Sequence, residues 1–403
     1  MDIQKIRQDF PLLNEKTHPK PVVYFDNACQ SLRPQSVIDA INRYYLEFPA
    51  CGGRSMHRLA ERVTRECDQA RYSIAKLLNA KRKEEIVFTR NTTEGINLVA
   101  NSLGLKKGDA VLITDKEHNS NLIPWQMLRE RVGIKIEIVP SLPDNLFNMD
   151  AYKKQINGST KLVAIGMTSN MDGVSVPADE IIQLAHKNGS LVLLDAAQTI
   201  PHQKVDVQKL NVDFLAFSGH KMLGPSGTGI LYGKFKLLER LEPYQVGGET
   251  VISTTYNDHK FLPPPEKFEA GLQDYAGIIG LGAAAEYLQK IGFPFIQKQE
   301  QQLNEFISSE IRSIPHLHIL GPADAHLRGG IVSFYLDGVD SHQVAIMLDQ
   351  MADILVRSGQ HCVHSWFNAN GIKGSVRASF YFYNTLQEAE IFVASLRKIT
   401  KVL

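Results

Sequence analysis

The sequence contains 403 residues, of which 43% are hydrophobic and 22% are charged, the composition of an ordinary soluble globular protein. This length is too great for one compact core and predicts two domains. The 44 basic and 43 acidic side chains give a formal net charge of +1. Such a balance indicates no electrostatic affinity for nucleic acid or for an anionic membrane.

The N-terminal segment and the cysteines indicate the compartment. The segment "MDIQKIRQDFPLL" is charged from its second residue and lacks the apolar core of a signal peptide, and no apolar stretch approaches the length of a membrane span. The four cysteines form no CxxC pair, which argues against a disulfide framework and against a zinc site: Cys29, Cys51, Cys67 and Cys362. We therefore expect a cytoplasmic protein with free thiols and no membrane association.

Short apolar runs alternate with helical patterns between residues 85 and 218. The apolar runs predict strands at 85–89, 109–114, 134–139, 161–168, 190–195 and 213–218. Helical periodicity separates several of them, at 93–103, 122–131 and about 178–188. This alternation predicts a mostly parallel sheet that helices cover on both faces, and ligands bind such sheets beyond the carboxyl ends of the strands.

The pattern changes after "PPPEKFEAG" at 263–271. Two long helices are predicted at about 277–291 and 295–312, followed by shorter elements: strands at 329–336, 352–359 and 375–384, and helices at 342–350 and 386–399. We expect a large domain over residues 15–290. A smaller α/β domain would combine residues 1–14 with 291–403, leaving a cleft between the two.

Polar residues stand at the carboxyl ends of the predicted strands. Asp195 ends one strand, and Lys221 follows the next. An acid and a lysine so placed suit pyridoxal phosphate, which needs an amine for a covalent bond and an acid to keep its pyridine nitrogen protonated. Asp195 also suits a helix N-cap. Thr92 and Thr93 open a predicted helix whose free N–H groups favour a phosphate, although the same residues before Glu94 also fit a capping box.

These residues belong to a series of motifs that resembles a known family. "DNA" (26–28), "TTEGINLVA", "EHNSNLIPW" (117–125), "SNMDG" (169–173), "DAAQ" (195–198), "SGHKMLGPSGTGILYG", "FEAG" (268–271), "VRSGQHC" (356–362) and "RASFYFYNT" (377–385) come in the order found in class V, fold-type I pyridoxal-phosphate enzymes. The chain is most similar to the SUF-type (group II) cysteine desulfurases and selenocysteine lyases. The resemblance implies an α/β fold-type I architecture, in which the large domain holds a mostly parallel sheet of the seven-stranded type. It also implies a pyridoxal 5′-phosphate cofactor and a homodimer with its sites at the interface.

The resemblance also implies a role for each site residue. Lys221 would bind the cofactor covalently and move protons, and His118 would lie over the ring as a further acid or base. The other cofactor-binding residues would be Asp195 at the pyridine nitrogen, Gln198 and Asn170 near the phenolic oxygen, and Thr92, Thr93, Ser218 and His220 at the phosphate. Arg377, with Asn170 and Arg357, would bind the carboxylate of the substrate, a task for which a guanidinium is suited.

Cys362 would be the nucleophile. It follows Arg357 and Gly359 and begins a polar, glycine-containing loop, at the place of the family's reactive cysteine. His361, Arg357 and His364 are the neighbouring groups that would favour its thiolate. The chain departs from the family at Leu272, which stands where a threonine usually reaches the partner subunit's phosphate. It also departs at Cys29 and Cys51, in loops that usually lack cysteine.

We therefore expect a cysteine desulfurase that converts L-cysteine to L-alanine and leaves a persulfide on Cys362. The sulfur would pass to an acceptor protein for iron–sulfur cluster or thio-cofactor synthesis. Three alternatives remain: a selenocysteine lyase or C–S β-lyase, a class V aminotransferase in which Cys362 is incidental, and a non-catalytic scaffold subunit. Intact Lys221, Asp195 and Arg377 argue against the last.

Overall fold

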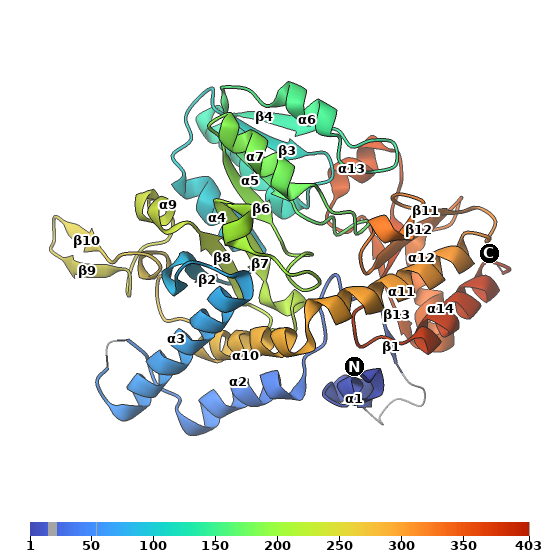
Figure 1. Cartoon of the computed structure of the whole chain (residues 1–403), viewed down its shortest axis with the longest axis horizontal. Helices are drawn as coiled ribbons and strands as arrows, with labels where there is room; N and C mark the ends of the chain where they lie inside the picture. Colours follow the sequence, from blue (N-terminus) through green and yellow to red (C-terminus); the bar gives the residue numbers. More distant parts are fainter. Residues whose placement is uncertain (15–21, 54, 403) are drawn as a thin grey trace.

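The computed structural model describes residues 1–14, 22–53 and 55–402. Its centre is a seven-stranded sheet in the order β2-β8-β7-β6-β5-β3-β4 (Figure 1). The strands are β2 (Ile86–Thr89), β3 (Ala110–Thr114), β4 (Lys135–Val139), β5 (Thr160–Gly166), β6 (Leu191–Asp195), β7 (Phe214–Ser218) and β8 (Gly229–Gly233). β8 runs antiparallel to both of its neighbours, whereas the pairs from β7 to β4 are parallel. The predicted α/β class with a mostly parallel sheet is thus confirmed.

Helices cover both faces of this sheet because its strands are apolar on both sides. Along β6, Val192 and Leu194 point into one hydrophobic cluster and Leu193 into the other. The first cluster is closed by α3 (Arg58–Leu78), α7 (Ala178–Lys187) and α10 (Tyr275–Ile291), and the second by α4 (Thr92–Ser102) and α5 (Ile123–Val132). The carboxyl ends of the strands remain free to hold a site.

Glycines let α10 approach its neighbours closely. A Cβ on Gly282 would lie 2.6 Å from the Cβ of Ala70 on α3. A Cβ on Gly280 would lie 2.8 Å from Ile41 on α2 (Gln35–Glu47). The glycines of "YAGIIGLGAAAEYL" therefore set the distance between these three helices.

A second, four-stranded sheet has the order β11-β12-β15-β14. It is formed by β11 (Leu317–Ile319), β12 (Ile331–Leu336), β14 (Arg357–Gly359) and β15 (Ser375–Ser379), with a hydrophobic core of its own. That core also takes side chains from α11 (Phe293–Ile311), α12 (Ser341–Ala352) and α14 (Leu386–Ile399). Two expected strands are shorter than predicted: 352–359 divides into β13 (Ile354–Leu355) and β14, and 375–384 ends as a strand at Ser379, after which four buried aromatic residues follow.

The N-terminal segment joins the second sheet to the large one. β1 (Val23–Tyr24) pairs in parallel with β13, and the next residues cross to the large sheet, where the N–H of Ser31 donates to the carbonyl of His220 at 3.0 Å. Before it, α1 (Ile3–Arg7) places Ile6 and Phe10 against the large core. The predicted domain boundaries at residue 15 and near 290 stay a prediction.

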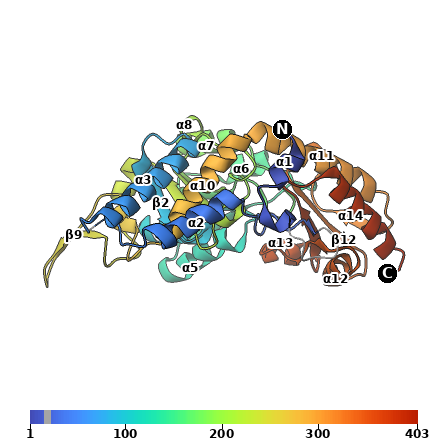
Figure 2. The ribbon, with the colours of Figure 1, turned by 90° about the horizontal axis from the view of Figure 1, so that it is seen from below.

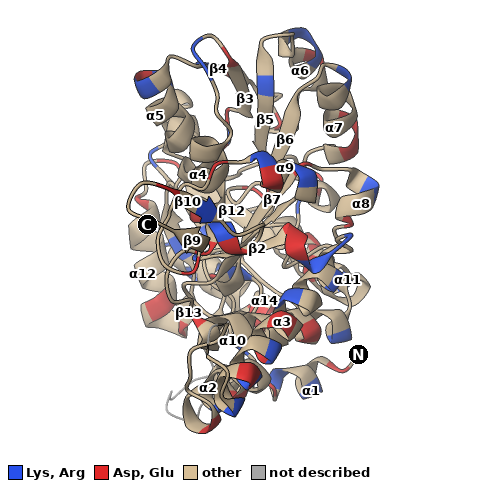
Figure 3. Ribbon diagram, turned by 90° about the vertical axis from the view of Figure 1, so that its left-hand side faces the viewer, with Lys and Arg blue, Asp and Glu red and all other residues tan. Residues whose placement is uncertain are grey.

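The remaining elements are short. They are α6 (Met149–Gln155), α8 (Val207–Leu210), α9 (Phe235–Arg240), α13 (His364–Ala369) and a hairpin of β9 (Val251–Thr254) and β10 (His259–Phe261). Figure 2 shows the hairpin extending away from the body at the end opposite the second sheet. Lysines and arginines alternate with acidic residues over the outer helices (Figure 3). None of the helices among the described residues is long and apolar enough to cross a membrane.

Candidate active site

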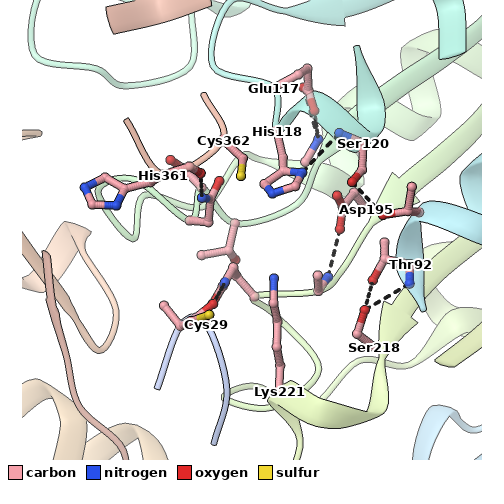
Figure 4. Close-up of a pocket in the computed structure, with 18 of the residues that line it drawn as sticks. Cys29, Thr92, Glu117, His118, Ser120, Asp195, Ser218, Lys221, His361 and Cys362 are labelled. Atoms are coloured by element: carbon pink, nitrogen blue, oxygen red, sulfur yellow. Dashed lines mark hydrogen bonds between the residues drawn. The ribbon is translucent and has the colours of Figure 1, made fainter. Parts of the chain in front are cut away.

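A cavity of about 230 Å³ lies where the carboxyl ends of β5, β6 and β7 face the second sheet. Every residue predicted for the site lines this cavity: Thr92, Thr93, His118, Asn170, Asp195, Gln198, Ser218, His220, Lys221, Arg357, Cys362 and Arg377. The large sheet, the second sheet and the N-terminal segment all contribute to it. Residues that are far apart in the sequence thus form one site (Figure 4).

Lys221 lies in the tight turn that leaves β7. The turn Gly219–Lys221 is closed by hydrogen bonds from the N–H of Gly219 to the carbonyl of Thr228 and from the N–H of Gly224 to the carbonyl of Gly219, both at 2.8 Å. Burial lowers the pKa of the Lys221 amine, and Asp195 opposes this shift. Desolvation therefore favours the neutral amine, the form that attacks a carbonyl carbon.

Asp195 ends β6 and faces the cavity. Its Oδ1 accepts a hydrogen bond from the N–H of Ala197 at 3.0 Å, and the residues after it form turns, so it caps no α-helix. Burial raises the pKa of the carboxyl group, while the bond from Ala197 and the charge of Lys221 oppose the rise. A cation in the cavity would stabilise the ionised form of this carboxyl group and so offset the cost of its burial.

Gln198 contributes an unpaired oxygen to the cavity. Its Nε2 donates to the carbonyl of Ala28 at 2.7 Å, whereas its Oε1 is buried and has no partner within the described part of the chain. Buried polar atoms are nearly always paired, so an orphan on a cavity wall indicates a ligand.

The N-terminus of α4 faces the same cavity. The helix is capped by Asn91, whose side chain accepts from the N–H of Glu94 at 2.9 Å, so the alternative of a capping box at Thr92 and Thr93 does not hold. Their hydroxyls contact serines instead: Thr92 Oγ1 lies 2.6 Å from Ser218 Oγ, and Thr93 Oγ1 lies 2.7 Å from Ser120 Oγ. Hydroxyls and free N–H groups at a helix N-terminus suit a phosphate.

His118 follows β3 and is neutral. Its Nδ1 accepts from the N–H of Ser120 at 3.1 Å, which places the proton of the neutral ring on Nε2. Burial, with the charges of Lys221 and Arg377, lowers its pKa to about 3. His220 is also neutral, because burial lowers its pKa to about 4.

Glu117 is a site residue that the sequence analysis did not single out. It is buried and accepts from Thr114 Oγ1 at 2.7 Å, Asn121 Nδ2 at 2.7 Å and the N–H of Gly166 at 2.9 Å. Burial raises its pKa to about 7. These bonds fix the loop that carries His118 against β5, and the only sequence signal for them was the "EHN" triplet itself.

Cys362 and His361 share an unusual backbone conformation. Both have positive φ angles, 60° and 50°, in the left-handed region that side chains rarely adopt. Two hydrogen bonds hold this corner: the N–H of Asn119 donates to the carbonyl of Cys362 at 2.8 Å, and Asn170 Nδ2 donates to the carbonyl of His361 at 2.7 Å. The sulfur faces the cavity (Figure 4).

His361 does not supply the positive charge expected beside Cys362. Its ring is buried, Nε2 lies 2.8 Å from Ser375 Oγ, and burial lowers its pKa to about 2, with Arg377 and Arg357 acting in the same direction. The imidazole is therefore neutral, and the cations of this wall are the two arginines.

Arg357 and Arg377 are direct neighbours across β14 and β15. Arg377 is 2% exposed, and its Nη1 donates to the carbonyl of Asn170 at 2.9 Å while its Nε has no partner among the described residues. Arg357 donates through Nη1 to Cys29 Sγ at 3.0 Å. Asp26 lies 3.5 Å from Arg377 and 3.9 Å from Arg357, and the sequence analysis assigned it no role.

Comparisons with known proteins agree with this arrangement. Residues 23–392 match the family described as aminotransferase class V. The chain is 41% identical over 401 residues to a cysteine desulfurase of Synechococcus elongatus, covering 99% of this chain and 64% of that protein. It is 39% identical over 406 residues to a cysteine desulfurase of Serratia proteamaculans, covering 100% and 99%.

Solved structures give the same result. The apo structure of a cysteine desulfurase from Thermococcus onnurineus NA1 superposes with a TM-score of 0.95 at 38% identity, covering 100% of this chain and 99% of that one. The cysteine desulfurase CsdA of Escherichia coli gives a TM-score of 0.91 at 32% identity, with coverage of 100% and 99%. The chain therefore belongs to the class V aminotransferase family, and the Serratia and Thermococcus relatives that it resembles over its full length are cysteine desulfurases.

Proposed function

We propose that this protein is a pyridoxal-phosphate-dependent cysteine desulfurase, which converts L-cysteine to L-alanine and leaves a persulfide on Cys362. The observation that carries the proposal is one cavity that gathers a desolvated amine on Lys221, a carboxyl group on Asp195, a guanidinium on Arg377 and the thiol of Cys362. Relatives of matching length carry the same activity in their names.

The residues present fit the cofactor. Lys221 would bind it covalently, Asp195 would face its pyridine nitrogen, and the hydroxyls of Thr92, Thr93 and Ser218 with His220 would surround its phosphate. Gln198 Oε1, which has no partner among the described residues, would accept a hydrogen bond from a polar group of the cofactor. When bound, pyridoxal phosphate supplies an electron sink for negative charge at the substrate's Cα.

Arg377 is prepared to hold the substrate's carboxylate. Its guanidinium is buried, donates through Nη1 to Asn170, and has an Nε without a partner among the described residues. Asp26, at 3.5 Å, offsets part of the desolvation of this cation, and an anionic ligand would offset more of it. Asn170 also holds the carbonyl of His361, so the carboxylate site and the Cys362 loop share a residue.

Lys221 and His118 would move the protons. The Lys221 amine accepts the proton from the substrate's Cα, since desolvation favours its neutral form. The neutral ring of His118 presents Nε2–H to the cavity and can donate there. Each such group contributes about 10²–10⁴-fold to a rate.

Cys362 would receive the sulfur. Its thiolate attacks the substrate's sulfur, so that an S–S bond forms while the Cβ–S bond breaks and its electron pair stays with the substrate carbon. Protonation of that carbon gives alanine, and the sulfur remains as a persulfide on Cys362. Orientation by Arg377 and Lys221 replaces a bimolecular encounter.

Product analysis tests the proposal. We expect purified protein supplied with L-cysteine to form alanine with an enzyme-bound persulfide, and borohydride reduction to fix a pyridoxyl group on Lys221. Cys362→Ala should keep the pyridoxyl label but lose alanine formation, whereas Cys51→Ala, outside the cavity, should resemble the unaltered protein. Pyruvate and ammonia in place of alanine would contradict the desulfurase and support a C–S β-lyase.

A homodimer and a sulfur-acceptor protein complete the proposal. Exposed apolar residues support a second copy of the chain as partner: Tyr256 and Ile252 on the projecting hairpin, and Leu272 near it in sequence. Leu272 would place an apolar contact where relatives of the resembled type place a hydroxyl. The molecular mass in solution tests the dimer. We also propose a cytoplasmic location for this protein.

A further inference from the structure

The active-site cavity contains a thiol that the proposed mechanism does not use. Cys29 lines the same cavity as Cys362, Lys221 and Arg357. Figure 4 shows its sulfur and that of Cys362 facing the space beside the Lys221 amine. Both other cysteines are described and lie outside this cavity: Cys51 is exposed, and Cys67 packs against the large core. The cavity therefore holds two sulfurs.

Cys29 is held firmly by its backbone. Its N–H donates to the carbonyl of Asp26 at 3.1 Å, and the preceding residue, Ala28, bonds to β15 and to the turn after β6. The N–H of Ala28 donates to Ser379 Oγ at 2.9 Å, and its carbonyl accepts from Gln198 Nε2 at 2.7 Å. These bonds hold the backbone of Cys29 in place on the cavity wall. Unlike Cys362, Cys29 is not among the residues with a positive φ angle.

The arginines give this point a positive surrounding. Arg357 Nη1 donates to Cys29 Sγ at 3.0 Å, and Nε of the neighbouring Arg377 has no partner in the part of the chain that the structure describes. Hydrogen bonds from a guanidinium are strongest toward an anion. A negatively charged sulfur on Cys29 would therefore be paired, and the repulsion between two anionic sulfurs would be reduced.

Both thiols line the cavity together with the Lys221 amine. A negative charge on either sulfur would favour the protonated form of this amine, in the same direction as Asp195. A persulfide adds a further S–S bond of about 2 Å to Cys362 and extends its reach into the cavity.

We infer that Cys29 is a second sulfur-accepting residue, which takes the outer sulfur of the Cys362 persulfide inside the cavity and is positioned by Arg357. The inference rests on the proposed function, because the donor is that persulfide. The Cys29 thiolate attacks the outer sulfur, a new S–S bond forms on Cys29, and the old S–S bond breaks with its electron pair leaving on Cys362. The proton of Cys29 passes to the released thiolate. No electrons are gained or lost, so no oxidant is required.

The number of alanines formed by each site tests the inference. A site that stores sulfur on one thiol gives a fast burst of one alanine before the slower turnover that is limited by release of sulfur to free L-cysteine, whereas a site with two thiols gives a burst of two. We expect a rapid-quench burst of two alanines per site in the unaltered holoenzyme and of one in Cys29→Ser, which keeps the side-chain size. Cys51→Ala is the matched control and should give two.

Mass spectrometry of alkylated peptides locates the sulfur. We expect the added sulfur first on Cys362 and then on Cys29, with Cys51 unlabelled over the same time. Arg357→Gln should slow the second step more than the first, and Arg357→Lys should restore part of it. A burst of one alanine in the unaltered protein, sulfur confined to Cys362, or a Cys29–Cys362 disulfide with released sulfide would each overturn the inference. No sulfur on Cys362 at all would instead overturn the proposed function.

Discussion

The buried histidines around the cavity are neutral because desolvation outweighs their hydrogen bonds. His118 has its pKa lowered to about 3 by burial and by the charges of Lys221 and Arg377. Such a group enters a reaction as a neutral donor through Nε2, and its protonation state does not change across the physiological range.

Replacing His118 with Gln tests this assignment. The amide keeps a donor but cannot give up and regain a proton, so we expect kcat for alanine formation to fall by about 10²–10⁴-fold while the absorption spectrum of the bound cofactor persists. Because His118 stays neutral in this range, kcat of the unaltered enzyme should show no inflection near pH 6.5 that depends on His118. The pH profiles of kcat for the unaltered enzyme and the variant should therefore have the same shape near pH 6.5. Such an inflection, or unchanged kcat, would contradict the assignment.

At the scale of elements, the site depends on how closely β8 approaches the start of α4. A Cβ built on Gly229 would lie 2.6 Å from Cα of Asn91, the residue that caps α4. The atom that this Cβ would meet belongs to the backbone of Asn91, so it cannot move without shifting the helix N-terminus that carries Thr92 and Thr93. Gly229, within "SGTGILYG", therefore allows the close approach that positions the helix N-terminus at the proposed phosphate site.

We expect Gly229→Ala to weaken cofactor binding and to lower stability by about 1–3 kcal/mol, the usual cost of overpacking. Gly158→Ala is the matched control, since a Cβ there meets no atom within 4 Å. Cofactor titration followed by absorbance, with thermal unfolding of the apo forms, measures both effects. Equal affinities in the two variants would show that the approach of β8 does not matter.

Much of the fold was predictable from the sequence, because buried parallel strands are continuous apolar runs. The six strands from 85 to 218 and the helices after 275 appear within a few residues of their predicted ends. β8 was missed, since "GILYG" is short and bounded by glycines. The aromatic run 380–383 favoured a longer strand, but these side chains are buried in turns next to β15.

The site was predictable only as far as motifs mark it. The resemblance named every residue of the cofactor and substrate walls that we propose, and all of them line one cavity. It did not indicate the contact of Arg357 with Cys29, or that of Asp26 with Arg377, because each joins residues more than 300 positions apart. No local pattern encodes such a pair. Nor did the sequence show that His361 is buried and neutral.

At the scale of the whole molecule, a fall in pH lowers the free energy of unfolding through the buried, neutral His361. The unfolded chain binds protons on His361 near pH 6.5, whereas the folded chain does so only near a pKa of about 2. The contribution of His361 to stability is therefore complete above pH 6.5 and is lost as the pH falls from there toward the lower pKa of the folded chain. Between the two pKa values, the free energy of unfolding falls by about 1.4 kcal/mol for each unit by which the pH is lowered.

Replacing His361 with Gln removes the pH-dependent contribution of this histidine to stability. We expect the variant to lose less thermal stability than the unaltered protein between pH 7 and pH 5, whatever its stability at pH 7. His259→Gln, on an exposed side chain with no ion pair in the described part of the chain, is the control and should follow the unaltered protein. Melting curves at four pH values measure the difference, and parallel curves for all three proteins would contradict the role of His361.

The path of the N-terminal segment has a consequence for how the protein is made. β1 pairs with β13, and Cys29 meets Arg357, so the cavity wall joins the beginning of the described chain to residues synthesised more than 300 positions later. During translation the large sheet can form first, with Lys221 already in its turn, but no closed cavity exists until β13, β14 and β15 have left the ribosome. A nascent chain would therefore be unable to release sulfur from free cysteine, and the reactive thiols would meet only in the finished molecule.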